Sequence, residues 1–374
     1  MTNHVTGITA QTTSTAPTAE EVKVNNEPVK EAPKQEKIQT PQKGAVTGEI
    51  SKYAGLDIGT MGIVSARQVG QNTIFKRIRN VFIDLTQEQV AMLKLGGNTS
   101  YVTKNEICYV LGDDASNIAN VFGRKLRAPM EKGVISAGET EGMEMLKIMV
   151  GEVLGEAPAG GICTVSSPSA PVDNDFDCIY HEAVIRDIVE SYGWEVHTAS
   201  ESTAMAYSEA ADSNFTCLAT SWGHGMVNTS LVFKSIEALK FSISRSGSWI
   251  DQNAAKVSGR TSGQMCSIKE KGIDLLNPTG REQSAISVYY KHLIGYVIKN
   301  FISKFRELQG NIELPEEIPL IVAGGTSLPK GFIDLVKQAI NKENGFPFAV
   351  SEVRHANDPL NSIAKGLLVM SQNR

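Results

Sequence analysis

Two apolar runs meet at a glycine turn that carries one acid, in the segment from Gly55 to Val64. The run that ends at Asp57 and the run that begins at Gly62 can pair as the strands of a hairpin. Glycines let a backbone approach an anion closely, and the exposed N–H groups of such a turn form a small nest of donors. Asp57 would repel a phosphate, so we expect it to hold a hydrated Mg²⁺ that bridges to the phosphates. The same pattern also occurs in purely structural turns.

Four later segments repeat or extend this pattern. Residues 218–232 form a second strand-turn-strand with glycines at the turn, and residues 321–332 form an apolar strand that runs into a Gly-Gly turn and a helix. Residues 200–207 read Ser-Glu-Ser-Thr-Ala-Met-Ala-Tyr, and residues 358–367 read Asp-Pro-Leu-Asn-Ser-Ile-Ala-Lys-Gly-Leu. Each segment alone is common, but the order of all five along one chain is specific.

In this order the segments resemble the actin-like ATPase superfamily, which also contains the seventy-kilodalton heat-shock chaperones and the sugar kinases. Bacterial actins such as MreB and MamK look most similar. Residues 127–135 (Arg-Ala-Pro-Met-Glu-Lys-Gly-Val-Ile) and 110–115 (Val-Leu-Gly-Asp-Asp-Ala) are similar to segments of that branch. The resemblance covers roughly residue 53 to the C-terminus. It implies an α/β, two-domain actin-like (ribonuclease H-like) fold with a nucleotide cleft between the domains.

The resemblance also implies domain boundaries and a nucleotide site. Domain I would span residues 53–198 with a C-terminal helix at 354–374 returning to it, and domain II would span residues 199–353. The implied cofactors are ATP or ADP with Mg²⁺, and Asp57 is the implied metal ligand. The implied nucleotide contacts come from the first turn (Asp57, Gly59, Thr60, Met61, Gly62), the second turn (Gly223, His224, Gly225), the adenosine turn (Gly324, Gly325, Thr326) and the pair Lys269 and Glu270.

Glu201 matches the acid with which the family begins its first connecting helix and orients the attacking water. Transfer of a γ-phosphate to water needs an aligned water and neutralised charge, so one carboxylate at this place suffices. The alternative is an acid that only favours the positive end of a helix capped by Ser200. For Lys269 and Glu270 the alternative is a charged, solvated helix face.

The second turn departs from the family, which usually has Asp-x-Gly-Gly-Gly-Thr where this chain has Ser-Trp-Gly-His-Gly-Met. Ser221 replaces an acid directed at the metal, and Met226 replaces a hydroxyl that would donate to phosphate. His224 adds bulk and can carry a positive charge where an anionic oxygen would lie. We therefore expect nucleotide binding with weakened turnover, and a degenerate site is the alternative.

Composition excludes several other classes. A net charge of −5 argues against nonspecific binding to nucleic acid, which needs a basic surface. The five cysteines show no metal-ligand or disulfide spacing, which favours a reducing cytoplasm. No apolar run reaches the length of a transmembrane segment or follows the pattern of a signal peptide. Residues 1–52 contain no aromatic residue and four prolines, so we expect a disordered tail, either a spacer or an arm for an adaptor.

Strand and helix patterns alternate through the rest of the chain, which indicates α/β layers. Strands are expected near residues 53–79, 162–168, 194–197, 236–244 and 318–323, and a peripheral insertion at 84–122. Helices are expected near residues 141–154, 177–192, 249–257, 283–308, 328–340 and 359–370. In the first of these helices Met143, Leu146, Met149, Val150 and Val153 are expected to share a core face.

The expected function is that of an ATP-binding, cytoplasmic protein that polymerises with itself into filaments and hydrolyses ATP slowly. A chaperone-like ATPase would need a peptide-binding domain after this region, and no such stretch precedes Arg374. A small-molecule kinase would need a catalytic base beside the first turn, where no convincing acid occurs. A nucleotide-free scaffold with the same fold stays open because of the altered second turn.

Overall fold

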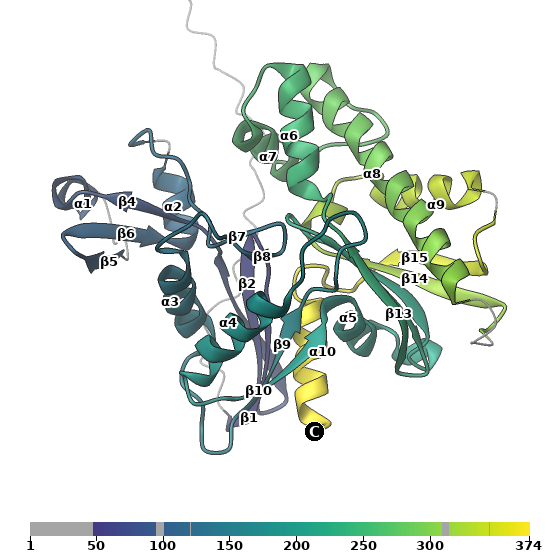
Figure 1. Ribbon diagram of the computed structural model, residues 1–374, viewed down its shortest axis with the longest axis horizontal. Coiled ribbons are helices and arrows are strands. Elements are labelled where there is room, and N and C mark those ends of the chain that lie inside the picture. Colours follow the sequence, from purple (N-terminus) through teal and green to yellow (C-terminus); the bar gives the residue numbers. More distant parts are fainter. Residues whose placement is uncertain (1–47, 95–100, 120, 309–313, 344) are drawn as a thin grey trace, which may run out of the picture. The chain divides into compact units, whose positions relative to one another are not determined.

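Two five-stranded sheets form the framework of the computed structural model (Figure 1), which describes residues 48–94, 101–119, 121–308, 314–343 and 345–374. Most of the predicted tail, residues 1–47, lies outside the described residues. The tail was expected to extend to Lys52, and this limit is wrong, because the first strand already begins at Ile50 and pairs there with Val69.

The first sheet has the order β10-β9-β1-β2-β3. Its antiparallel part consists of β1 (Ile50–Ile58), β2 (Gly62–Val69) and β3 (Asn72–Arg79), and its parallel part adds β9 (Ile162–Ser167) and β10 (Glu195–Ser200) to β1. The glycine turn therefore joins the central strand to its antiparallel neighbour, as the apolar pattern predicts.

The second sheet has the same topology, in the order β13-β12-β11-β14-β15. Its antiparallel strands are β11 (Cys217–Trp222), β12 (Val227–Phe233) and β13 (Ile236–Ile243), and β14 (Glu317–Ala323) and β15 (Ala349–His355) extend it in parallel from β11. The second glycine turn joins β11 to β12, so the two turns occupy equivalent positions in two equivalent sheets.

Helices bury the largest hydrophobic core cluster of each sheet against one of its faces. The core of the first sheet contains α3 (Gly142–Leu154) and α4 (Ile179–Glu190), and that of the second contains α6 (Gly247–Ser258), α7 (Ser262–Glu270), α8 (Gly280–Glu307) and α9 (Phe332–Lys342). The helix expected near residues 283–308 is observed as α8, whose buried face runs from Ile286 to Phe301, with Tyr289 and Phe305 partly buried.

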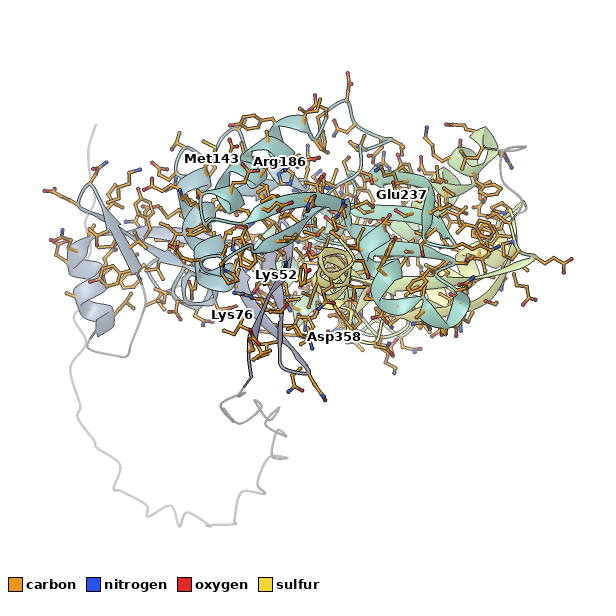
Figure 2. All side chains as sticks on the ribbon, turned by 90° about the horizontal axis from the view of Figure 1, so that it is seen from below. Lys52, Lys76, Met143, Arg186, Glu237 and Asp358 are labelled. Carbon is orange, nitrogen blue, oxygen red and sulfur yellow. The ribbon has the colours of Figure 1, made fainter. Side chains whose placement is uncertain are left out.

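Two details of the helix predictions are wrong. Met143, labelled in Figure 2, is 44% exposed, and Met145 lies in the core instead, because α3 begins at Gly142 with a different face toward the sheet. The helix expected from residue 328 begins at Phe332. The chain first makes a 3₁₀ turn at Gly325–Ser327, and Leu328 remains exposed.

Two helices rich in small residues cross between the sheets. They are α5 (Glu201–Glu209) and α10 (Ser362–Gln372), and α10 also packs on β1 (Figure 1). A Cβ added at Gly366 would lie 1.7 Å from the carbonyl oxygen of Ala204, and one added at Gly55 would lie 2.2 Å from that of Ala364. At these glycines α10 therefore approaches both α5 and β1 too closely for any side chain.

The predicted peripheral insertion is a small three-stranded sheet with its own core. It contains β4 (Phe82–Leu85), α1 (Gln87–Lys94), β5 (Tyr101–Lys104), β6 (Ile107–Leu111) and α2 (Gly112–Ile118). The remaining short elements are the hairpin of β7 (Met130–Glu131) and β8 (Val134–Ile135) and a 3₁₀ turn at Ala211–Ser213. Among the described residues, no helix has the length and apolar character that crossing a membrane requires.

Candidate functional site

A cavity of about 880 Å³ lies where the glycine turns of the two sheets meet. Every site residue expected from the sequence lines it: Asp57, Gly59, Thr60, Met61, Gly62, Glu201, Gly223, His224, Gly225, Lys269, Glu270, Gly324, Gly325 and Thr326. Segments separated by more than 200 residues in the chain therefore converge on one space, whose volume falls within the roughly 300–1,000 Å³ of small-molecule sites.

The first turn is held by its own backbone and by a buried asparagine. Gly59 N–H donates to the carbonyl of Gly62 at 2.9 Å, so this donor is used within the turn. Asn80 donates from its side chain to the Gly59 carbonyl at 3.0 Å and from its backbone to the Met61 carbonyl at 3.2 Å. Asn80 was missed from the sequence because a single asparagine after a strand has no motif.

Asp57 lies at the end of β1, and its Oδ1 atom is buried without a hydrogen-bond partner among the described residues. Burial raises the pKa of Asp57 to about 6, although the Ser166 hydroxyl and the charge of Arg77 oppose the rise. A buried carboxylate oxygen without a hydrogen bond or a cation lowers the stability of the folded protein. Such an atom is suited to a cation.

Glu201 lies on the other side of the cavity, at the start of α5, where Ser200 caps the helix by accepting from Thr203 N–H. Burial, together with repulsion from the Asp57 carboxylate, raises the pKa of Glu201 to about 8. The Oε2 atom accepts hydrogen bonds from Ser221 Oγ at 3.2 Å and Asn228 Nδ2 at 3.0 Å, which oppose the rise. The Asn228 side chain is fixed in turn by Ser169 N–H, which donates to its Oδ1 at 3.1 Å.

The second turn packs directly against the first. A Cβ added at Gly225 would lie 2.1 Å from Thr60 Oγ1 and 2.5 Å from the backbone nitrogen of Gly133. Thr60 Oγ1 also accepts a hydrogen bond from Gly133 N–H at 3.0 Å, which ties the β7–β8 hairpin to both turns. Glycine is therefore required at position 225 by packing alone.

His224 is neutral in this setting. Burial and the positive charges of Lys269 and Arg79 lower the pKa of its imidazole to about 3. The sequence left open a positive charge on the second turn, and the structure excludes it at neutral pH. The turn therefore differs from its family pattern through bulk rather than through charge.

Lys269 is buried, which excludes the solvated-helix-face interpretation for this residue. Its Nζ atom donates to Asp251 Oδ2 at 2.7 Å and to the Gly247 carbonyl at 3.2 Å. Glu270 pairs with Arg79 of β3 at 2.9 Å, so this ion pair connects α7 to the first sheet. Asp251 and Arg79 were both missed, since neither lies in a glycine motif.

The adenosine turn is shaped by close backbone contact. Gly324 has a φ of +92°, and a Cβ there would lie 2.4 Å from the Trp222 carbonyl oxygen. Thr326 Oγ1 donates to the Gly223 carbonyl at 2.8 Å, which joins this turn to the second one. Backbone packing alone therefore requires glycine at position 324, whether or not a ligand lies against it.

Solved structures with a similar fold include MamK and MreB5. The MamK double helical filament matches with a TM-score of 0.62 and 14% identity over 85% of this chain and 98% of that chain. MreB5 of Spiroplasma citri matches in its AMPPNP-bound form (TM-score 0.60, 13% identity, 86% and 96% coverage) and its ADP-bound form (TM-score 0.58, 13% identity, 86% and 96% coverage). At these identities the likeness establishes the fold, which is that of the two-domain actin-like ATPases.

Sequence comparison assigns the family more narrowly. No curated protein matches the chain by sequence. The family model described as Volactin matches residues 53–371, the same region that the glycine turns and connecting helices occupy. The chain belongs to the Volactin family, whose model spans its entire actin-like part.

Proposed function

We propose that this protein binds an adenine nucleotide with Mg²⁺ in the cavity between its sheets and assembles into filaments. The observation that carries the proposal is the convergence of three glycine turns on one cavity that also contains Asp57 and Glu201. Backbone N–H groups of glycine turns suit phosphate oxygens, and a pair of buried acids suits a divalent cation.

The residues present fit Mg²⁺ at the first turn. Asp57 Oδ1 is buried and unpartnered among the described residues, and burial together with the Asp57 charge raises the pKa of Glu201. A divalent cation would relieve both conditions, and Asp57 would hold it. Bound there, Mg²⁺ would neutralise charge on the phosphates.

The nucleotide would span the cavity from the glycine turns to the adenosine turn. Gly324, Gly325 and Thr326 line one side of the cavity, where a flat base and a ribose would lie against their backbone. The AMPPNP-bound and ADP-bound structures of MreB5, which share the fold, support an adenine nucleotide as the ligand.

Slow hydrolysis would depend on Glu201. Its carboxylate would accept a hydrogen bond from the attacking water and so align it, which requires the ionised form. With a pKa of about 8 the group is mostly protonated at neutral pH until a cation or ligand changes its surroundings. Ser221 supplies a neutral hydroxyl where the family usually places a second acid, so we expect turnover to be weak.

Self-assembly rests on the likeness to MamK, whose matched structure is a double helical filament. We expect the filament to be cytoplasmic, and we expect the chain that precedes β1 to serve as the arm for an adaptor. Sedimentation and negative-stain microscopy of the purified chain in Mg-ATP and in Mg-ADP test this. More pelleted protein and visible filaments are expected in ATP, and protein that stays monomeric at high concentration in both nucleotides would refute assembly.

A nucleotide-free scaffold is the second candidate, and the second turn favours it. Ser221 replaces the acid and His224 places a neutral ring beside the cavity. Calorimetry with Mg-ATP separates the two candidates. Filaments that form without any measurable nucleotide binding would establish the scaffold.

A further inference from the structure

Three potential metal ligands from three separate elements meet beside the nucleotide cavity. They are His224 of the second turn, Asp251 of α6 and Cys266 of α7. One ligand atom from each lies within 4.8 Å of the other two, and the His224 Nδ1 atom is 4.0 Å from Asp251 Oδ2. We propose that this cluster binds a thiophilic divalent cation, Zn²⁺ in particular, distinct from the Mg²⁺ expected at Asp57.

Asp251 supplies an independent observation. Its side chain is almost completely buried, and Lys269 occupies only one carboxylate oxygen, Oδ2, at 2.7 Å. The other oxygen, Oδ1, is buried and has no hydrogen bond of good geometry in the part of the chain that the structure describes. The Cys266 thiol acts on the same carboxyl and lowers its pKa, so a metal would take the place of the thiol proton between these two groups. A buried unpaired carboxylate oxygen costs free energy that a metal ion would recover.

The chemistry of the three groups selects the type of cation. A set of one imidazole nitrogen, one thiolate and one carboxylate oxygen is typical of Zn²⁺ rather than of Mg²⁺ or Ca²⁺, which prefer oxygen alone. The thiolate is the ligand, so the Cys266 proton leaves to solvent on binding. Three protein ligands leave one position for water or for a further protein oxygen.

The spacing requires a modest contraction. Tetrahedral Zn²⁺ with ligand bonds of about 2.0–2.3 Å separates its ligand atoms by about 3.3–3.8 Å. The side chains must therefore approach one another by up to about 1.5 Å, and the half-buried His224 and Cys266 can rotate to do so. The thiol of Cys266 already contacts Glu270 Oε1 at 3.8 Å, so an additional oxygen lies near the cluster.

Opposing charge limits the affinity but does not block the site. The Lys269 ammonium would repel a cation at Asp251, and Arg79 is engaged with Glu270 nearby. Before a metal binds, the carboxylates of Asp251 and Glu270 balance these two positive charges, and burial raises the pKa of the Cys266 thiol. The attraction for a divalent cation therefore arises only when metal binding displaces the thiol proton and creates a third negative charge.

Metal titration of the chelator-treated, full-length protein without nucleotide tests the site. With Co²⁺ as the probe, we expect one equivalent to bind with a sulfur-to-metal charge-transfer band and a tetrahedral visible spectrum. Zn²⁺ should displace it, and Zn²⁺ alone should raise the melting temperature. Cys266→Ser should abolish the charge-transfer band, and His224→Gln should lower Zn²⁺ affinity about tenfold or more.

Cys178→Ser is the matched control, because Cys178 is likewise a half-buried cysteine but lies outside the cluster. It should leave the cobalt spectrum unchanged. Asp251→Asn leaves Lys269 without its charged partner and risks unfolding, so the conclusion depends on the other two variants. No cobalt binding, or binding unaffected by both Cys266→Ser and His224→Gln, would overturn the proposal. Because nucleotide is absent throughout, this result is separate from the test of ATP binding.

Discussion

The two glycine turns occupy equivalent places in two sheets of the same topology, yet they differ in chemistry. The strand that leads into the first turn carries Asp57, whose buried Oδ1 atom has no hydrogen-bond partner among the described residues. The second has Ser221 at the matching place, and its hydroxyl donates to Glu201. The difference teaches that a shared backbone position does not carry a shared role. The first turn keeps an atom suited to a cation, whereas the second serves to hold Glu201.

Glu201 connects the two turns and provides the largest expected effect. Glu201→Gln keeps an acceptor oxygen but removes the carboxylate that would align water, so phosphate release should fall about 100-fold or more while ATP affinity is little changed. Single-turnover phosphate release and calorimetry measure the two quantities. Glu195→Gln, at an exposed strand residue, is the control. An unchanged rate would remove Glu201 from the reaction.

A matched pair of substitutions compares the two turns directly. Asp57→Asn should weaken Mg-ATP binding about 10- to 100-fold, the equivalent of losing one charged contact, and should abolish the Mg²⁺ dependence of affinity. Ser221→Ala should change affinity much less, because Ser221 contacts Glu201 rather than a ligand group. Titration of a fluorescent ATP analogue with and without Mg²⁺ gives both values. Equal losses in the two variants would contradict the division of roles.

The glycines of the two turns differ in the space that surrounds them. A Cβ at Gly225 would collide with Thr60 and the Gly133 backbone, whereas the nearest atom to a Cβ at Gly62 is 3.7 Å away. Gly225→Ala should therefore lower the free energy of unfolding by about 1–3 kcal/mol, and Gly62→Ala by less than about 1 kcal/mol. Urea unfolding measures both. A tolerated Gly225→Ala would mean that the two turns can separate at low cost.

Sequence patterns predicted these turns well because glycine spacing and apolar runs are local signals. Asp57 and Glu201 each begin or end an element that such patterns identify. Asn80, Asn228 and Asp251 were not predicted, since each acts through a partner far away in the chain and carries no motif. Their roles depend on contacts between distant parts of the chain, which cannot be predicted from a single sequence.

Errors at element ends have similar causes. Met143 was assigned to the core of α3 because apolar spacing alone fits more than one helix face, and tertiary packing selected Met145. The predicted start of the helix after the adenosine turn, residue 328, is too early. The 3₁₀ turn at Gly325–Ser327 and Pro329 come first, and the helix begins at Phe332. The sequence left the charge of His224 open, because the burial that lowers the pKa of its imidazole is not visible in the sequence.

The acid pair should make stability of the nucleotide-free protein depend on pH. The pKa of Glu201 is raised from 4.5 to about 8, so the folded state binds this proton more tightly than the unfolded state, and stability falls as pH rises between these values. Between pH 6 and 8 the slope attributable to Glu201 should be about 1 kcal/mol per pH unit. Glu201→Gln should remove that slope in thermal or urea unfolding. An identical slope in both proteins would contradict the raised pKa.

The smallest expected effect comes from converting the second turn toward the family pattern. Ser221→Asp with His224→Gly should raise phosphate release about tenfold at saturating Mg²⁺, by adding a metal-directed acid and freeing space and N–H groups near the phosphates. The new carboxylate would face Glu201 Oε2, which Ser221 now contacts at 3.2 Å, so without Mg²⁺ the like charges should raise the pKa of Glu201 further and the gain should vanish. Adding Glu201→Gln to the double variant should remove the gain in phosphate release, which shows that the gain depends on Glu201.

If the starting protein binds no nucleotide and the double variant releases no phosphate, the second turn only supports Glu201, and the scaffold candidate is correct.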